Sequence, residues 1–480
     1  MATITRIQTF FRVLVILAFF CLTGERNFAA DYYVAPNGND WQGDGSAERP
    51  WLTVRKAIAT VPDDGSRIIL KDGLYKETIG GSRAFQQLCT IEAENPYRTR
   101  ISSPEDSNRV MLLQSLSNVA FRGIDFFGSG SVNNDYLIHI TTAQTHDITF
   151  ENCIIHDSYK NDLIKVNSRA HRIVFRECIF FNQTNRGGDE HFDINTVTDV
   201  VVEDSIFFND YAGSNRPEEN AGHPFFVIKN SGSTPNITKD ITLRRNIFLN
   251  WSGRQDSGFI LLGEDGQPFW EAQNILIENN LFLHHSKVPF WGALLFKGGL
   301  KDIVVRANTV TGHPTIGGFG TYAVVCINIG ANPKMEKISF VNNIFSDPSG
   351  KMPRFSATAA DRFATDTDLV ALNNLYWNAG KPIPSEATDL FIPALDPEAV
   401  LDNPMLEEVP QTQILPRLDP KTNRFLSGTT TIREEFERLV ALYAVPGQGS
   451  AAIGAAKADQ MPKENILGKP RGSNPNIGCF

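Results

Sequence analysis

Acidic residues crowd into one short stretch of the chain, GGDEHFDIN at residues 187–195. Asp189, Glu190 and Asp193 lie within five positions of each other there. A fourth acid, Asp162, opens the segment that the repeat described below places one coil earlier. Four carboxylates around one point repel each other unless a cation lies between them. Because Ca²⁺ takes six to eight oxygen ligands, these four residues predict a Ca²⁺ site.

Lysines occupy related positions in neighbouring segments. The segments align on the inward apolar residues Val166, Ile194, Ile228, Leu262 and Phe296. Because adjacent parallel strands lie roughly 4.8 Å apart, the alignment predicts one outward column made of Lys165, Asp193, Lys229, Gly263 and Lys297. One interpretation of this column is a ladder of ion pairs, each contributing a few tenths of a kcal/mol to about 1 kcal/mol. The other interpretation is that the column forms part of a catalytic site.

A cation held beside a lysine suits the cleavage of a uronic-acid polymer. The C5 proton of a uronate is hard to remove while the neighbouring carboxylate is charged, and Ca²⁺ on that carboxylate stabilises the negative charge that develops. A partly desolvated lysine close to cations can have its pKa lowered enough to act as the base. Elimination of the C4 glycosidic oxygen then breaks the chain without a water nucleophile.

A repeat of strand-like segments must position these residues. In each copy apolar and polar residues alternate, a polar residue makes a turn, and an apolar pair follows; a period of two predicts strand. The copies are 146–158, 171–183, 198–210, 239–251, 273–285, 301–313, 336–348 and 367–379, with a looser copy at 117–129. Their turn residues are Cys153, Cys178, Ser205, Asn246, Asn280, Asn308, Asn343 and Asn374. A unit of about 25 residues that stays β throughout predicts a right-handed parallel β-helix, with the asparagines stacked from coil to coil.

A second strand is expected in each coil, and it carries the acids and lysines. Its segments are 162–167, 191–195, 226–230, 259–264 and 294–299. Residues 32–58 resemble the N-terminal coil of many secreted β-helix proteins, where a short helix caps the core. Residues 429–444 have helical spacing and are expected to pack near the C-terminal end. The expected fold is therefore all-β, with loop insertions on one face.

Residues 1–30 have the composition of a secretory signal peptide, with two arginines before the short apolar run 13–22 and two alanines before residue 31. The run is too short to span a bilayer comfortably. We therefore expect a soluble, secreted or periplasmic protein with one β-helix domain over residues 31–480 and no membrane span. A monomer is expected, and the net charge of −9 argues against nucleic acid as a partner.

At the acids and one lysine, the sequence resembles the family-nine polysaccharide lyases, the β-helix pectate lyases. The motif of that family is a D-D-x-aromatic-D cluster, an earlier Asp one coil away and a lysine one coil later. DEHFD (189–193) matches the cluster, NDLIKV (161–166) supplies Asp162, and FFVIKNSG (225–232) supplies Lys229. The resemblance implies Ca²⁺ on the acids, Lys229 as the Brønsted base, and a pectate-like acidic polysaccharide as the substrate.

The sequence departs from this family motif in four respects. Glu190 replaces the second Asp, His191 stands where the family has glycine, and the turn 182–188 is longer. In addition, the usual glycine pair before the lysine is missing from the Lys229 strand. His191, as a turn residue, is expected to face solvent or to contact substrate or metal.

Other basic residues are candidates for binding substrate carboxylates, namely Lys165, Lys297, His223 and Arg254. Lys165 is also the rival base, because it flanks Asp193 from the other side. His223 belongs to the insertion 209–224, which is expected to overhang Lys229 and to lower its pKa.

Two further function classes remain open. One is a non-catalytic β-helix that binds glycans or decorates a cell surface. The other is a glycoside hydrolase, for which the acids of residues 189–193 would supply the necessary carboxylate pair.

Overall fold

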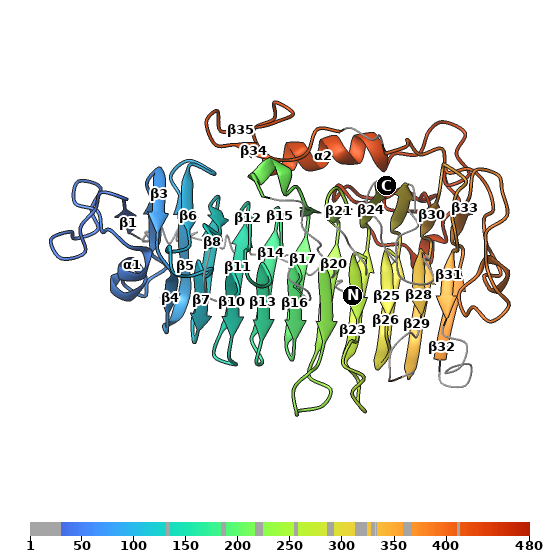
Figure 1. The fold of residues 1–480 in the computed structure, drawn as a ribbon, viewed down its shortest axis with the longest axis horizontal. Helices are drawn as coiled ribbons and strands as arrows, with labels where there is room; N and C mark the ends of the chain where they lie inside the picture. Colours follow the sequence, from blue (N-terminus) through green and yellow to red (C-terminus); the bar gives the residue numbers. More distant parts are fainter. Residues whose placement is uncertain are drawn as a thin grey trace, which may run out of the picture.

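Three long parallel sheets form the body of the protein, with 12, 11 and 10 strands among the described residues. The structure, a computed structural model, describes residues 30–130, 135–183, 189–216, 224–253, 258–285, 292–312, 324–327, 332, 334–358, 367–409 and 413–480. Each complete coil contributes one strand to each sheet, and successive coils stack along one axis (Figure 1). The right-handed parallel β-helix predicted from the repeats is confirmed.

The strands of each sheet follow one another in chain order. The 12-stranded sheet comprises β1 (Asp31–Val34), β2 (Arg67–Leu70), β5 (Ala84–Ala93), β8 (Ser117–Arg122), β11 (His146–Glu151), β14 (His171–Arg176), β17 (Thr198–Glu203), β20 (Lys239–Arg244), β23 (Ala272–Glu278), β26 (Leu300–Arg306), β29 (Met335–Val341) and β32 (Thr367–Leu372). The 11-stranded sheet comprises β3 (Gly73–Lys76), β6 (Thr99–Ser102), β9 (Asp125–Phe127), β12 (Ile154–His156), β15 (Ile179–Phe181), β18 (Ile206–Phe208), β21 (Ile247–Leu249), β24 (Leu281–His284), β27 (Thr309–Gly312), β30 (Ile344–Ser346) and β33 (Leu375–Trp377). The 10-stranded sheet comprises β4 (Ile79–Gly81), β7 (Met111–Gln114), β10 (Ile138–Thr141), β13 (Ile164–Asn167), β16 (Phe192–Asn195), β19 (Phe226–Lys229), β22 (Ile260–Leu262), β25 (Leu294–Phe296), β28 (Val325–Ile327) and β31 (Ser356–Thr358).

Inward side chains from all three sheets make one continuous core. Phenylalanine rings stack from coil to coil inside it, with centroids 4.8–4.9 Å apart along the series Phe180, Phe207, Phe248 and Phe282. Stacked aromatic pairs contribute about 0.5–1.5 kcal/mol beyond the burial of their area. This packing fixes which residues of every strand face inward, and therefore which residues face outward.

The predicted asparagine ladder forms at the turn between the 12-stranded and 11-stranded sheets, and its five members are at most 1% exposed. The side-chain oxygen of Asn308 accepts the backbone N–H of Asn280 at 2.9 Å, and its Nδ2 donates to the side-chain oxygen of Asn343 at 3.0 Å. The residue before each ladder asparagine has a left-handed φ of 52–56°, so the turn is tight. Cys153 and Cys178 occupy the equivalent turn positions, as predicted, and both are buried.

Replacing Asn308 by alanine should lower the free energy of unfolding by about 2–4 kcal/mol, because the buried N–H of Asn280 loses its acceptor. Urea unfolding measures this loss. The matched control is Asn95→Ala, an exposed asparagine that hydrogen-bonds to Asp72, for which a change within about 0.5 kcal/mol is expected. Equal losses in the two variants would contradict a stabilising role for the ladder.

Two α-helices in the described part of the chain lie outside the coils. α1 (Val54–Thr60) buries Val54, Ala57 and Ile58 against the first coils, and it confirms the expected N-terminal cap. After β33, the chain runs back over the outer face of the 11-stranded sheet, where it forms the short strands β34 (Leu418–Asp419) and β35 (Arg424–Phe425) and then α2 (Ile432–Tyr443) (Figure 1). Apolar residues of α2 pack on outward isoleucines and leucines of this sheet, so the sheet is covered on both faces. The helix predicted at 429–444 is confirmed as α2.

None of the helices in the described part of the chain is long and apolar enough to cross a membrane. Residues 1–29 of the predicted signal peptide lie outside the described residues.

A buried charge network joins the 11-stranded sheet to the segment that contains Ser214 and Arg216. The ring nitrogens of His156 lie 2.9 Å from Asp125 Oδ1 and 2.7 Å from Asp157 Oδ2. Asp157 also accepts a hydrogen bond from Ser214 at 3.0 Å, and it pairs with Arg216 at 3.3 Å. Burial alone would lower the pKa of His156, but the two carboxylates outweigh it and raise the pKa to about 9.

The stability of the protein should therefore depend on pH through His156. Its folded pKa of about 9 exceeds the unfolded value of about 6.5, so the stabilisation is complete below about pH 6.5 and is lost as the pH rises through 9. We expect the wild type to lose a few kcal/mol more than His156→Gln between pH 6 and 10, because glutamine keeps a polar side chain that does not titrate. Parallel pH profiles of the unfolding free energy would contradict this assignment.

Candidate metal centre

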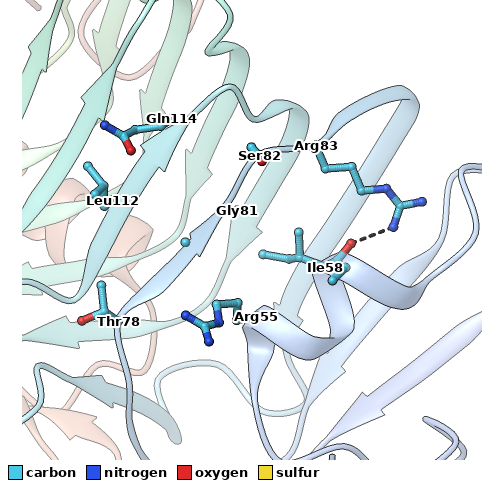
Figure 2. A pocket seen from close by; sticks show the side chains of 10 residues that line it. Arg55, Ile58, Thr78, Gly81, Ser82, Arg83, Leu112 and Gln114 are labelled. Atoms are coloured by element: carbon cyan, nitrogen blue, oxygen red, sulfur yellow. Dashed lines mark hydrogen bonds between the residues drawn. The ribbon is translucent and has the colours of Figure 1, made fainter.

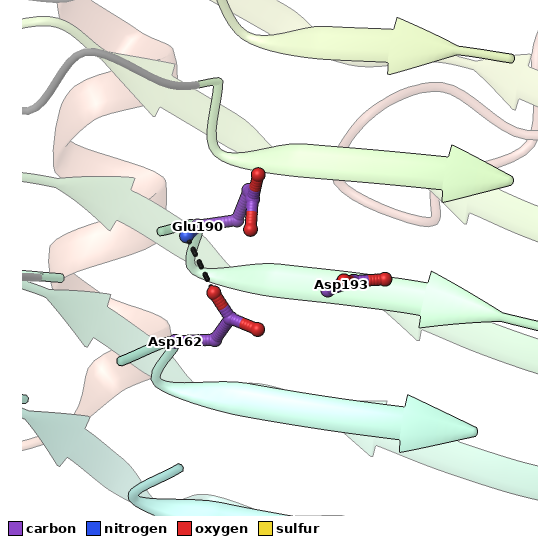
Figure 3. Close-up of side chains that lie close together, drawn as sticks. All are labelled: Asp162, Glu190 and Asp193. Atoms are coloured by element: carbon purple, nitrogen blue, oxygen red, sulfur yellow. Dashed lines mark hydrogen bonds between the residues drawn. The ribbon is translucent and has the colours of Figure 1, made fainter. Parts of the chain in front are cut away.

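Three carboxylates converge on the outer face of the 10-stranded sheet, where two neighbouring strands begin (Figure 3). Asp162 and Glu190 each lie two residues before a strand, β13 and β16, and Asp193 lies within β16. One oxygen from each residue lies within 4.8 Å of the others, and the three residues are 2–6% exposed. The backbone N–H of Glu190 donates to Asp162 Oδ1 at 2.9 Å, which ties the two coils together. Among the described residues, this is the one group of three or more His, Cys, Asp or Glu side chains arranged to share an ion.

The electrostatics of this cluster disfavour three negative charges. Burial, followed by repulsion from Glu190 and Asp193, raises the pKa of Asp162 well above its usual range. Burial and the charge of Asp193 also raise the pKa of Glu190. Asp193 Oδ1 is buried and has no hydrogen-bond partner. A bound cation would relieve both the repulsion and the missing contact.

The predicted outward column of charged residues is wrong in its register. The inward residues align as predicted, pairing in the order Val166, Ile194, Ile228, Leu262 and Phe296. Asp193 precedes its inward residue whereas Lys229 follows its own, so Asp193 pairs with Val227 and Lys229 pairs with Asn195. Of the lysines in the predicted column, only Lys165 pairs directly with Asp193. Beyond Asp193 the column continues into the buried apolar side chains of Val227, Leu261 and Leu295.

Both lysines nevertheless reach the carboxylates. The ammonium group of Lys165 forms an ion pair with Asp193, and Lys229 Nζ lies 3.9 Å from Asp193 Oδ2 on the diagonal. Lys229 also forms an ion pair with Glu264, and its Nζ lies 3.9 Å from Asp265 Oδ1. Burial favours the neutral form of each lysine, but the surrounding carboxylates outweigh it and raise the pKa of both. The expected lowering of the Lys229 pKa is therefore wrong for the protein without a bound cation.

Residues 264–271 hold the carboxylates that face Lys229, and they were not foreseen as part of the site. The buried side chain of Glu271 accepts the backbone N–H groups of Glu264, Asp265 and Gln267, each at 2.9 Å. This hydrogen bonding shapes the turn after β22 so that Glu264 faces Lys229 and lies 3.8 Å from Lys297 Nζ. The sequence GED (263–265), which follows a strand of the 10-stranded sheet and carries two acids, is the signal that would have identified Glu264 and Asp265.

The remaining predicted residues fall into three groups. Asp189 is partly exposed and is not among the three carboxylates that converge. His191 is fully buried rather than solvent-facing: it stacks on Phe225 at 4.2 Å, its Nε2 lies 3.0 Å from Asn209 Oδ1, and burial lowers its pKa to about 3. His223 and Arg254 lie outside the described residues.

Comparisons with known proteins give matches only at the level of structure. No protein-family model and no curated protein sequence matches the chain. Among solved structures, the chain is similar to pectate lyase Pel9A, with 14% identity, a TM-score of 0.47, and coverage of 94% of this chain and 96% of that chain. It is also similar to a rhamnogalacturonan lyase (12% identity, TM-score 0.44, 84% of this chain and 94% of that chain). A third similar structure is endo-xylogalacturonan hydrolase from Aspergillus tubingensis (10% identity, TM-score 0.45, 77% of this chain and 99% of that chain).

Proposed function

We propose that the protein is a Ca²⁺-dependent polysaccharide lyase that cleaves a pectate-like uronic-acid polymer by β-elimination. The observation that carries this proposal is a cluster of three buried carboxylates with two lysine ammonium groups beside it on one outer face. The carboxylates supply a cation site and a lysine supplies a base, which are the two groups that abstraction of a proton next to a carboxylate requires.

The residues present fit Ca²⁺. Ca²⁺ lies 2.3–2.6 Å from its oxygen ligands, so ligands on opposite sides of one ion are up to about 5 Å apart, and the three carboxylates approach to within 4.8 Å. The unpartnered Oδ1 of Asp193 is available as a ligand. Asp162, Glu190 and Asp193 would hold the ion, and Asp189 is proposed as a further ligand from the adjoining turn.

Lys229 is the proposed base and would receive the C5 proton on Nζ. Glu264 orients its ammonium group, and Asp193 lies 3.9 Å away, so the amine borders the carboxylate cluster. Bound Ca²⁺ would supply charge stabilisation for the uronate carboxylate and a positive charge that favours the neutral lysine. Lys165 neutralises Asp193, and Lys297, His223 and Arg254 are proposed contacts for other uronate carboxylates.

A glycoside hydrolase is the second candidate function, and one observation favours it. Burial and neighbouring charges raise the pKa values of Asp162 and Glu190, and a carboxylic acid that keeps its proton near neutral pH can donate it to a leaving glycosidic oxygen. The paired lysines favour the lyase, because hydrolysis does not need them.

A panel of purified uronans, including polygalacturonate and alginate, separates these functions. Each polymer is incubated with the protein in Ca²⁺ and, separately, in a chelator. The lyase should produce the ultraviolet absorbance of an unsaturated product only in Ca²⁺. New reducing ends without that absorbance would establish the hydrolase, and binding without cleavage would establish a non-catalytic glycan-binding protein.

We further propose that residues 1–30 direct export and that residues 31–480 act as one monomeric domain. N-terminal sequencing of the exported protein tests the cleavage site. Limited proteolysis tests whether residues 31–480 form one domain, and separately folding halves would contradict this. Sedimentation tests whether the protein is a monomer, and a stable dimer would contradict that.

A further inference from the structure

A hollow of about 620 Å³ lies on the surface at the N-terminal end of the β-helix (Figure 2). α1 forms one wall, and β4 and β7 of the 10-stranded sheet form the floor. Its polar and charged lining residues are Arg55, Thr78, Ser82, Arg83 and Gln114, and Gly80, Gly81 and Leu112 are among the others. The hollow exists in part because residue 80, which pairs with the outward residue Leu112, has no side chain on this face of the sheet.

The hollow lies on the same outer face as the carboxylate cluster, and the strand register connects them. Gly80 pairs with Leu112, Leu112 with His139, and His139 with Lys165, which pairs with Asp193. With roughly 4.8 Å between strands, the floor of the hollow is three to four strands, or roughly 14–19 Å, from Asp193. The face between them carries partly exposed polar rings, because Tyr136 packs on His139 with ring centroids 4.9 Å apart, and Lys165 lies over Tyr136.

The hollow presents positive charge on a chain whose net charge is −9. Arg55 is exposed, and among the described residues no carboxylate forms an ion pair with its guanidinium. Arg83 donates to the carbonyl oxygen of Ile58 at 2.7 Å and lies over the ring of Phe85, which holds it against the wall. Glu77 is the nearby acid, and its carboxylate already accepts the N–H groups of Val54 and Arg55 at the start of α1.

We propose that this hollow is a distal subsite for the same acidic polysaccharide, binding a uronate residue roughly 14–19 Å from the carboxylate cluster. The inference rests on the proposed function for the identity of the ligand. Arg55 receives a uronate carboxylate, because an unpaired guanidinium matches the geometry of a carboxylate. Gln114 and Ser82 offer hydrogen bonds to sugar hydroxyl groups, and the side chain of Leu112 faces the sugar ring.

Kinetics on substrates of different length test the subsite. A trigalacturonate cleaved at the cluster leaves at most two sugar residues on one side of the cleaved bond, whereas polygalacturonate continues into the hollow. Arg55→Gln should raise the KM for polygalacturonate about threefold to tenfold and leave kcat and trigalacturonate cleavage unchanged. Gly80→Leu should have the same effect, because residue 80 has room for a side chain beside Leu112 and does not have a left-handed φ. Arg424→Gln, at an exposed arginine on β35, is the matched control and should change neither substrate.

A binding experiment separates failure of this inference from failure of the proposed function. Trigalacturonate is titrated calorimetrically into the Asp193→Asn variant in a chelator, so that neither cleavage nor the cation is present. Binding to this variant that is lost in the double variant Asp193→Asn, Arg55→Gln supports the subsite. If the wild type cleaves polygalacturonate and Arg55→Gln keeps its KM, the subsite is wrong while the lyase stands. If no uronan is cleaved but Arg55-dependent binding persists, the subsite stands and the lyase is wrong.

Discussion

Replacing Lys229 by alanine should lower turnover on a uronan about 10²–10⁴-fold, the usual effect of removing a general base. The expected result follows from the position of its amine, 3.9 Å from Asp193 Oδ2 and in an ion pair with Glu264. Ca²⁺ binding, the fold and most of the affinity for the polymer should be retained, because Lys229 is not a ligand in the cluster. Initial rates of unsaturated-product formation measure the effect.

Three comparisons make this result specific. Lys229→Arg keeps the positive charge beside Glu264 but cannot lose its proton, so it should be as inactive as the alanine variant if the role is that of a base. Lys239→Ala, at an exposed lysine on the 12-stranded sheet, should retain full activity. Lys165→Ala should mainly weaken substrate binding. Near wild-type turnover of Lys229→Ala would refute the assignment and make Lys165 the next candidate for the base.

The pH dependence of turnover provides an independent check on Lys229. The carboxylates around it outweigh burial and raise its pKa, so the amine stays protonated at neutral pH. Its neutral form becomes more abundant only as the pH rises. The rate of a reaction that needs this amine should therefore increase toward alkaline pH. A carboxylic acid donor, as in a hydrolase, would lose its proton and its activity over the same change.

Replacing Asp193 by asparagine should abolish or strongly weaken Ca²⁺ binding and remove nearly all Ca²⁺-dependent turnover. Asp193 contributes a buried oxygen without a hydrogen-bond partner, and its loss leaves two carboxylates whose pKa values burial still raises. An amide also provides less negative charge for a hard cation. Calorimetric titration with Ca²⁺, with and without a uronan, measures the binding.

Asp189→Asn is the matched comparison, because Asp189 is a neighbouring acid outside the converging group. It should weaken Ca²⁺ binding less than Asp193→Asn does. Equal losses of Ca²⁺ affinity in the two variants would show that Asp189 is as important a ligand as Asp193. A wild-type protein that binds no Ca²⁺ even in the presence of a uronan would refute the metal site.

The sequence alone determined the coiled architecture and the proximity of Asp162, Glu190 and Asp193. Alternation with period two identified the inward residues, and the core packs them in the predicted register from Val166 to Phe296. Once that register holds, Asp162 and Glu190 fall at the same position before successive strands. Proximity between residues of adjacent coils follows directly from a regular repeat, so it can be predicted without a structure.

Only the tertiary structure decided which groups face the lysines. Alternation shows which face a residue occupies, but residues on either side of an inward position share that face, so the pairing of Lys229 with Asn195 was not predicted. The raised pKa of Lys229 depends on Glu264 and Asp265, which reach it because Glu271 folds their turn. His191 is buried because Phe225 of the following coil covers its ring. These contacts depend on the conformations of variable turns between coils, where insertions leave no periodic pattern from which side-chain neighbours can be inferred.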